Sequence, residues 1–298
     1  MTFNIFSQTT VIAFLLILIS AISVLAQEPS SVKSFDTGEV TLNYELTGTG
    51  EPLVLIHGYT HNKRTWNLQM SALTNHFRVL RYDRRGWGAS GGFADVSADS
   101  KDLALLLDHL DISSAHIIGH SQGGHVALRF AMSYPDKVDR LVLYGAPAPA
   151  GFGIPWDGPD AFPSNMAQIA RDHGLDSVGT IIFSHPLARG FKEGTPGAKI
   201  ASEMWASYDG ADLLNPKQPS GATPAPMAQD LNTINSPTLV ITGEWEMAYF
   251  QLVAEAYNYA IPDSERVIVS GGGHAVHMQQ PYRFNGEILR FLTEGANK

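Results

Sequence analysis

A serine between small residues is the first feature of this sequence that could do chemistry. The pentapeptide Gly119-His120-Ser121-Gln122-Gly123 follows a short apolar run and opens a stretch with helical periodicity. A strand that turns sharply into a helix pushes such a serine hydroxyl out of the sheet edge, and the glycines avoid collisions across the tight turn. The pentapeptide alone is a weak signal in a chain with 28 glycines, so its placement is what makes Ser121 a candidate nucleophile.

A serine nucleophile needs a base that takes its proton, and the base needs an acid that fixes its tautomer. Among 11 histidines, His274 has the best position, because it follows an apolar run through three glycines and therefore lies at the end of a strand. A metal pair with His277 lacks a nearby carboxylate at ligand spacing, so we expect no metal. The remaining histidines that we considered carry no second catalytic signal or flank the serine on its own turn and helix: His61, His76, His109, His116, His120, His125, His173 and His185.

Two carboxylates could serve as the acid. The apolar run 238–242 leads into Gly243-Glu244-Trp245-Glu246, again at the end of a predicted strand. Either Glu244 or Glu246 satisfies the chain order serine, acid, histidine. The residues alone leave this choice open.

A second glycine motif suggests different chemistry. Gly86-x-Gly88-x-x-Gly91 follows a predicted strand, as in dinucleotide-binding proteins. The next helix starts only near Ser97, however, and the following strand ends without an acidic residue for a ribose hydroxyl. We therefore expect a glycine-rich turn here and no cofactor.

The elements that must position these residues alternate along the chain. Short apolar, β-branched runs predict strands at residues 40–46, 53–56, 78–82, 116–118, 141–144, 238–242 and 267–269. Helical periodicity between them is clearest at residues 103–110 and 126–131. Most of the strands are apolar throughout, which is typical of a parallel sheet covered on both faces. The sequence therefore predicts an α/β fold.

The alternation breaks between about Ala146 and Asp230, where Pro, Gly and aromatic residues mix with short helical pieces and no strand is readable. We interpret residues 147–230 as a cap inserted above the sheet. Residues 27–146 and 231–298 then form one core domain. The cap's aromatic residues would either roof the site with apolar surface or simply attach the cap to the core.

The composition excludes several classes of protein. Lys and Arg number 20 against 29 Asp and Glu, so a formal net charge of −9 argues against binding to nucleic acid or an anionic membrane. The absence of Cys excludes disulfides and cysteine nucleophiles.

The N-terminus predicts export. Residues 11–25 form an apolar run that is short for a membrane span, and small residues precede a cleavage site after Ala26. We expect residues 1–26 to be a signal peptide, with a periplasmic or secreted mature protein that is not inserted in a membrane. No Lys or Arg precedes the run, so an uncleaved membrane anchor is the alternative.

Several motifs together resemble the α/β-hydrolase superfamily, of the type with a helical cap, over about residues 34–292. They are Leu53-Val54-Leu55-Ile56-His57-Gly58-Tyr59, Tyr82-Asp83-Arg84-Arg85-Gly86-Trp87-Gly88-Ala89-Ser90, Gly119-His120-Ser121-Gln122-Gly123-Gly124, Pro237-Thr238-Leu239-Val240-Ile241-Thr242-Gly243-Glu244 and Gly272-Gly273-His274. The resemblance implies a mostly parallel sheet with helices on both faces. It also implies Ser121 as nucleophile, His274 as general base and acid, and an oxyanion hole made by the backbone N–H groups of Tyr59 and Gln122. The resemblance further implies that residues 86–90 form a structural turn of the family.

One position departs from the family pattern, because Glu246 stands where relatives usually carry Asp. A glutamate is one methylene longer but can also hold an imidazole, so we expect Glu246 to be the acid and keep Glu244 as the alternative. Some relatives place the acid after the strand that ends at Tyr144, but residues 145–153 contain no carboxylate.

These features predict a serine hydrolase without a cofactor that cleaves a small hydrophobic or aromatic carboxylic ester or lactone. Cofactor-free perhydrolases, carbon–carbon bond hydrolases and amidases share the pattern. A non-catalytic binding protein on the same fold is a further alternative.

Overall fold

The computed structural model describes residues 31–153, 156 and 161–293. The expected signal peptide, residues 1–26, lies outside the described residues and stays a prediction. Among the residues that are described, no helix is both long enough and apolar enough to span a membrane.

The described strands form one eight-stranded sheet in the order β1-β2-β4-β3-β5-β6-β7-β8. Strand β2 pairs antiparallel with both of its neighbours, β1 and β4, and all other neighbouring strands are parallel. The strands are β1 Lys33–Asp36, β2 Thr41–Thr47, β3 Glu51–Ile56, β4 Phe77–Asp83, β5 Ala115–His120, β6 Val138–Tyr144, β7 Thr238–Gly243 and β8 Ser264–Val269. The sequence did not predict β1, because this exposed edge strand contains polar residues and no apolar run.

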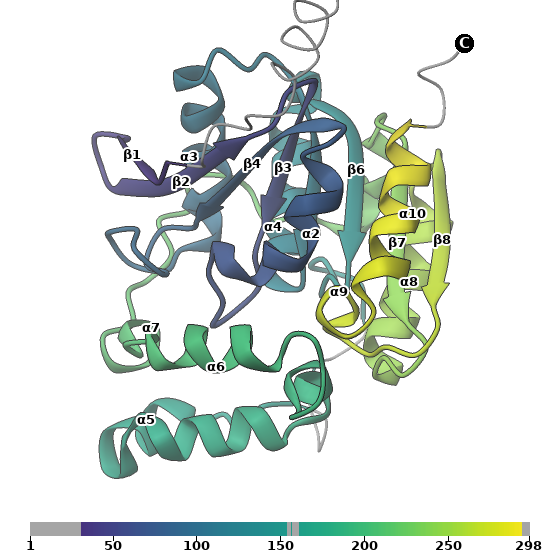
Figure 1. Cartoon of the computed structure of the whole chain (residues 1–298). Coiled ribbons are helices and arrows are strands. Elements are labelled where there is room, and N and C mark those ends of the chain that lie inside the picture. Colours follow the sequence, from purple (N-terminus) through teal and green to yellow (C-terminus); the bar gives the residue numbers. More distant parts are fainter. Residues whose placement is uncertain (1–30, 154–155, 157–160, 294–298) are drawn as a thin grey trace, which may run out of the picture. The chain divides into compact units, whose positions relative to one another are not determined.

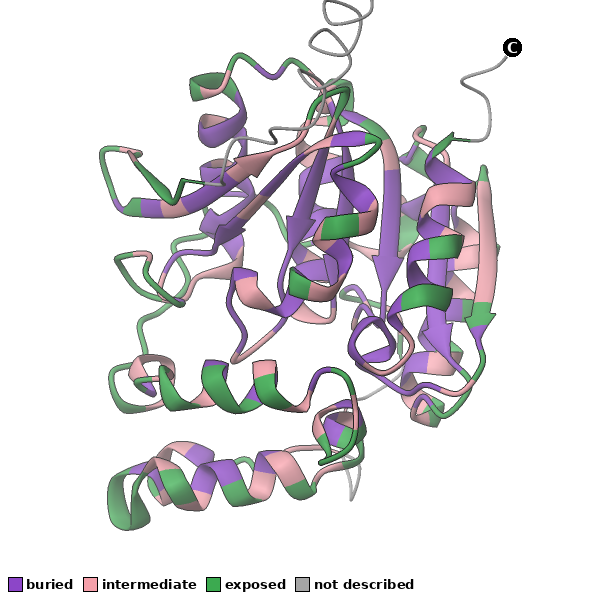
Figure 2. Ribbon diagram, in the orientation of Figure 1, coloured by how far each residue is buried: buried purple, intermediate pink, exposed green. Residues whose placement is uncertain are grey.

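Helices cover both faces of the sheet (Figure 1). On one face lie α2 Asn67–Leu73, α9 Val276–Gln279 and α10 Pro281–Thr293; on the other lie α3 Val96–His109, α4 Gln122–Ser133 and α8 Ala248–Ala260. Alternate residues of one strand serve the two faces: Val54 packs in the cluster of α3, α4 and α8, whereas Leu53 packs in the cluster of α2 and α10. The central strands are accordingly buried (Figure 2).

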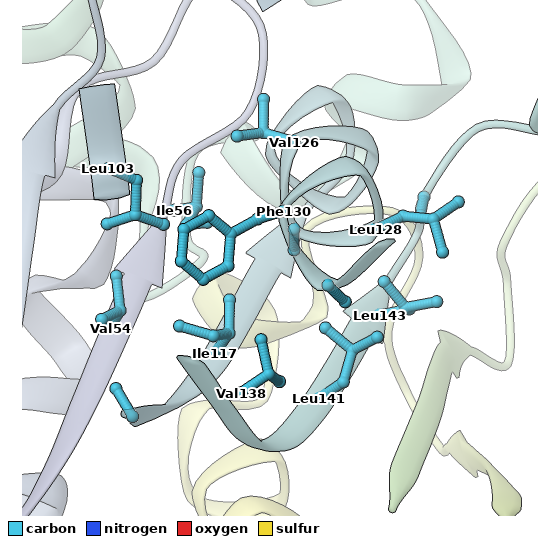
Figure 3. Packing of buried hydrophobic residues seen from close by; sticks show 14 of the residues in the cluster. Val54, Ile56, Leu103, Ile117, Val126, Leu128, Phe130, Val138, Leu141 and Leu143 are labelled. Atoms are coloured by element: carbon cyan, nitrogen blue, oxygen red, sulfur yellow. The ribbon is translucent and has the colours of Figure 1, made fainter. Parts of the chain in front are cut away.

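The helix that follows Ser121 packs tightly against the sheet. Phe130 of α4 is fully buried and lies in a cluster with Val54, Ile117 and Leu141 from three neighbouring strands (Figure 3). This packing fixes the helix that begins directly after the candidate nucleophile, Ser121.

A helical insertion separates β6 from β7. Its described elements are α5 Met166–Ser184, η4 Pro186–Phe191, α6 Ala198–Ala206, α7 Ala211–Leu214 and η5 Ala228–Thr233. Helices α5 and α6 lie beyond the carboxyl ends of the parallel strands (Figure 1). The described part of this insertion contains one isolated bridge, between Ala150 and Met227. The expected fold class, a mostly parallel sheet with helices on both faces and an inserted helical cap, is confirmed.

Two short 3-10 helices complete the described elements, η1 Lys63–Trp66 and η2 Pro135–Lys137. Leu231 of η5 is fully buried in the apolar cluster of the core, so this helix packs on the sheet side of the insertion.

Candidate active site

Ser121 lies at the turn between β5 and α4 in a strained conformation. Its φ of 53° and ψ of −124° are rare for a residue with a side chain, and such strain is characteristic of functional sites. The turn is so tight that a Cβ on Gly119 would lie 2.3 Å from the carbonyl oxygen of Gly123. The backbone N–H of Ser121 donates to the carbonyl of Tyr144 over 2.8 Å, which anchors the turn to β6.

His274 and Glu246 form a buried pair beside this turn. The Nδ1 atom of His274 lies 2.9 Å from Oε2 of Glu246, whose side chain has no solvent exposure. The carboxylate therefore favours the tautomer with the proton on Nδ1 and leaves Nε2 as an acceptor. Within the described part of the chain, Nε2 of His274 is buried and has no hydrogen-bond partner.

A glycine makes room for this pair. Gly145, at the end of β6, has a φ of +52°, and a Cβ there would lie 2.9 Å from Cε1 of His274 and 3.5 Å from Oε2 of Glu246. The glycine directly follows a predicted strand, but sequence patterns do not indicate this requirement for space.

Glu244 has a different environment. It is exposed, and its Oε2 accepts a hydrogen bond from the backbone N–H of Gly271 over 2.9 Å. Of the two candidate acids, the structure thus brings Glu246 to His274 and uses Glu244 to connect two loops.

Two side chains hold the backbone of the candidate base. The carbonyl of His274 accepts hydrogen bonds from the hydroxyl of Tyr144 and from Nε2 of His120, the latter over 3.0 Å. The sequence offered no role for His120 beyond flanking the serine on the same turn. The structure gives it a supporting contact with the loop that carries His274.

The loop that contains Tyr59 approaches the turn of Ser121. A Cβ on Gly58 would lie 3.2 Å from Cβ of Ser121, and a Cβ on Gly123 would lie 2.4 Å from the carbonyl of His57. Close approach of these two backbones brings the regions of the Tyr59 and Gln122 N–H groups next to the serine. The structure therefore brings together, beside Ser121, the two backbone segments that carry the candidate oxyanion donors.

Ser121 and His274 line one small cavity of about 50 Å³. Its other walls come from the Tyr59 loop, β5 and the cap: Tyr59, Thr60, His61, His120, Phe162, Ile182, Leu187, Ala188 and Phe191. The cap side is apolar, and the core side is polar. A larger hollow of about 510 Å³ lies at the amino ends of the strands, away from Ser121.

His61 also lines the cavity of Ser121, although it has no second catalytic signal in the sequence. It lies in the Tyr59 loop, its ring contacts Phe191 edge-to-face at 5.3 Å, and its Nδ1 lies 3.3 Å from the hydroxyl of Thr65. Burial lowers its pKa to about 3, so the imidazole is neutral at physiological pH. Its closeness in sequence to Tyr59 was the signal that could have identified it.

His277 does not form a metal site with His274. Its ring is fully buried, its Nε2 lies 2.9 Å from the hydroxyl of Thr65, and burial holds its pKa well below the ordinary value. In the residues covered by the structure, no group of three or more His, Cys, Asp or Glu could hold a metal ion.

The glycine motif at residues 86–91 forms a turn against β4. Gly86 and Gly88 both have positive φ, and the carboxylate of Asp83 accepts the backbone N–H groups of Lys63 and Ala89 over 2.7 and 2.9 Å. A Cβ on Gly86 would lie 2.2 Å from the backbone nitrogen of Ala94, so the turn is too closely packed for a larger residue.

A carboxylate of the cap connects to the loop that contains Tyr59. The hydroxyl of Tyr59 donates to Asp212 of α7 over 2.7 Å, and the hydroxyl of Tyr208 donates to the same carboxylate over 2.6 Å. The Tyr208 ring is stacked with that of Trp87 at 6.2 Å. Sequence patterns could not show this contact, because 153 residues separate Tyr59 from Asp212.

With this geometry in place, comparison with known proteins identifies the family. Residues 53–287 match the model of the alpha/beta hydrolase family. The chain belongs to this family.

Individual relatives differ in the reactions that their names describe. The chain is 30% identical to a 2-hydroxy-6-oxononadienedioate/2-hydroxy-6-oxononatrienedioate hydrolase of Burkholderia vietnamiensis, over 86% of this chain and 92% of the relative. It is 29% identical to a putative non-heme chloroperoxidase of Synechocystis, over 86% and 96%. Among solved structures, a thermophilic esterase of Thermogutta terrifontis has a TM-score of 0.72 and 27% identity, over 89% of this chain and 99% of that one.

Proposed function

We propose that this protein is a serine hydrolase that cleaves carboxylic esters or lactones with Ser121, His274 and Glu246. The observation that carries this proposal is the buried pair of His274 and Glu246. The Nε2 atom of His274 has no hydrogen-bond partner among the described residues, and His274 lines the same cavity as the strained Ser121. The similarity to a solved esterase supports it.

In the proposed mechanism, Nε2 of His274 takes the hydroxyl proton as Ser121 attacks the ester carbonyl. Glu246 stabilises the imidazolium that forms. The backbone N–H groups of Tyr59 and Gln122 donate to the tetrahedral oxyanion, and a donor of this kind contributes about 3 kcal/mol to the transition state. His274 then protonates the leaving alkoxide, and water cleaves the acyl-enzyme with the same base.

The cavity favours a small, uncharged acyl group. Its volume of about 50 Å³ is small for a ligand pocket. Apolar cap residues such as Phe162 and Phe191 face polar residues of the core, including the neutral His61. A larger hydrophobic or aromatic ester needs the cap to move outward.

The alternatives on this fold use the same nucleophile and differ in the substrate. A dicarboxylate substrate, as named for the Burkholderia relative, calls for a cation that pairs with it. The described residues that line the cavity include neither Lys nor Arg. Amidase and perhydrolase activity remain outcomes of the substrate test.

The test is a substrate panel run on the wild type and on Ser121→Ala. We expect p-nitrophenyl acetate or butyrate to be turned over faster than longer esters, amides or a carbon–carbon bond substrate, and we expect Ser121→Ala to abolish this turnover. If peracid formation with hydrogen peroxide or amide cleavage exceeds ester hydrolysis, the ester assignment is wrong. If no substrate is turned over, the binding-protein alternative holds.

We also propose export, on the evidence of the N-terminal sequence alone. N-terminal sequencing of the protein from its native host should then begin at Gln27. Recovery of Met1 on a membrane-bound form would support the anchor instead.

A further inference from the structure

Arg84 is a buried cation that the proposed mechanism leaves without a role. It directly follows β4, is fully buried, and its Nη1 lies 3.1 Å from Oδ2 of the equally buried Asp99. A buried ion pair costs several kcal/mol in lost hydration, so it is weak evidence for a stabilising purpose by itself. The other contacts of this guanidinium point to the active site.

The Nη2 atom of Arg84 contacts both segments that carry the candidate oxyanion donors. It donates to Oε1 of Gln122 over 2.6 Å and lies 3.5 Å from the carbonyl oxygen of Gly58. The carbonyl of Gly58 and the N–H of Tyr59 belong to one peptide group. Arg84 thus lies behind the Tyr59 peptide and holds the side chain of Gln122.

The imidazole of His57 adds a second link between Arg84 and this peptide. Its Nε2 accepts the backbone N–H of Arg84 over 3.0 Å, and its Nδ1 lies 2.9 Å from the Gly58 carbonyl. Since Nε2 acts as acceptor, Nδ1 carries the proton and donates. The Gly58 carbonyl is therefore contacted by two groups: the guanidinium of Arg84, and the imidazole of His57, which accepts a hydrogen bond from the backbone of Arg84.

We propose that Arg84 is a positioning residue for the oxyanion hole, which fixes the Tyr59 and Gln122 N–H groups and places a positive charge behind them. A donor on the carbonyl of a peptide strengthens hydrogen bonding by the N–H of the same peptide. A fixed charge near the developing oxyanion acts in a water-poor site, where it is weakly screened. This inference rests on the proposed serine hydrolase activity.

Arg85 provides a matched control. It is also a buried arginine, and its Nε and Nη2 bond both oxygens of Asp102 over 2.6 and 2.7 Å. None of its hydrogen bonds among the described residues reaches Gly58 or Gln122. Arg85→Met therefore removes a buried ion pair of the same kind without touching the oxyanion hole.

The experiment compares Arg84→Met, Arg84→Lys and Arg85→Met with the wild type. It measures kcat and KM for p-nitrophenyl butyrate, inhibition by an alkylboronic acid, and the urea midpoint. A boronic acid forms a tetrahedral anion on the serine and so reports on the oxyanion hole. We expect Arg84→Met to lower kcat about 10- to 100-fold with little change in KM, and to weaken boronate binding by a similar factor. Arg84→Lys should recover part of the loss.

Arg85→Met should shift the urea midpoint and leave kcat within about threefold of the wild type. Equal losses of kcat in Arg84→Met and Arg85→Met, or unchanged boronate affinity in Arg84→Met, would overturn the inference. If Arg84→Met does not fold, Gln122→Ala takes its place, because this variant keeps the backbone N–H donor of residue 122 and removes the side-chain contact with Arg84. An unchanged kcat and an unchanged boronate affinity in Gln122→Ala would also contradict the inference. A wild type that neither turns over esters nor binds boronates refutes the proposed function instead.

Discussion

The carboxyl edge of the sheet and the cap that faces it are built differently. At the edge, the backbones of Ser121 and His274 are each held by hydrogen bonds from or to β6, and the surrounding side chains are buried. In the described part of the cap, the largest helix, α5, contributes a small apolar cluster of Met166, Ala170, Val178 and Ile182, and much of its surface is exposed (Figure 2).

This difference suggests that the sheet edge carries the proposed catalytic groups and that the cap determines which substrate is accepted. The candidate catalytic groups lie on turns and loops that directly follow tightly packed strands, whereas regions with few buried apolar contacts open at low free-energy cost. We therefore expect changes at the sheet edge to abolish turnover, and changes in the cap to alter which ester is cleaved.

The largest expected effect is at the acid. Glu246→Ala removes the partner of His274 Nδ1 and should lower kcat on p-nitrophenyl acetate by about 1,000-fold or more. Glu244→Ala removes only the hydrogen bond to the backbone of Gly271 and should cost less than about threefold. Steady-state kinetics on both variants checks this. Equal losses, or a larger loss for Glu244→Ala, would reverse the assignment.

The second-largest expected effect is a loss of folding stability at low pH. His57, His61, His120 and His277 are buried, and burial holds each pKa below the ordinary value of 6.5. Below pH 6.5 the unfolded chain therefore binds more protons than the folded chain, so this contribution to stability is present above pH 6.5 and is lost as the pH falls. Between pH 7.5 and pH 5.5, each histidine that stays neutral in the folded protein lowers the free energy of unfolding by about 1.4 kcal/mol.

Two buried carboxyls, Asp99 and Asp102, act in the opposite direction, because burial raises the pKa of each. Burial raises the pKa of Asp99 to about 7, which offsets about 2 kcal/mol of that loss at pH 5.5. Urea unfolding should then give a lower free energy of unfolding at pH 5.5 than at pH 7.5, and His277→Gln should reduce this loss. A free energy of unfolding that stays constant between these pH values would contradict the neutral, buried state of these histidines.

In the cap, Phe191 should control the size of the acyl group. Phe191 lines the cavity of Ser121 and also a neighbouring groove of about 320 Å³ between cap elements. Phe183 lines this groove but not the cavity of Ser121. Phe191→Ala should raise the ratio of octanoate to acetate ester turnover by about tenfold, because it joins the two spaces. Phe183→Ala is the control and should change the ratio less. Identical ratios in both variants would remove Phe191 from the specificity determinants.

The smallest expected effect is at the contact between the cap and the Tyr59 loop. Asp212→Asn keeps the shape of the side chain but removes the charge that accepts the hydroxyls of Tyr59 and Tyr208. We expect kcat/KM to fall about three- to tenfold, with most of the change in KM. A change confined to kcat would indicate that the cap contact acts on the chemistry itself.

Sequence patterns predicted the parts of this molecule that depend on local signals. Apolar runs located the seven strands that were expected, and the turn at Ser121 follows from its glycines. The choice of Glu246 came from the resemblance and not from the residues. The structure places it against His274, while the role of this pair stays a proposal.

What the sequence could not provide depends on contacts between distant segments. Edge strand β1 has no apolar run, and the interactions of His61, Asp212 and Arg84 join segments that only the folded sheet brings together. Such contacts leave no periodicity in the chain. The reason that Gly145 must be small likewise becomes visible only beside His274.

Labelling with a fluorophosphonate tests the proposed chemistry most directly, since the reagent modifies serines that a general base activates. Mass spectrometry of the labelled wild type should find one adduct, on the peptide with Ser121, and none in Ser121→Ala. Glu246→Ala should label much more slowly than Glu244→Ala. An unlabelled wild type under conditions that label a control esterase, or an adduct on another serine, would contradict the assignment of Ser121 as the nucleophile.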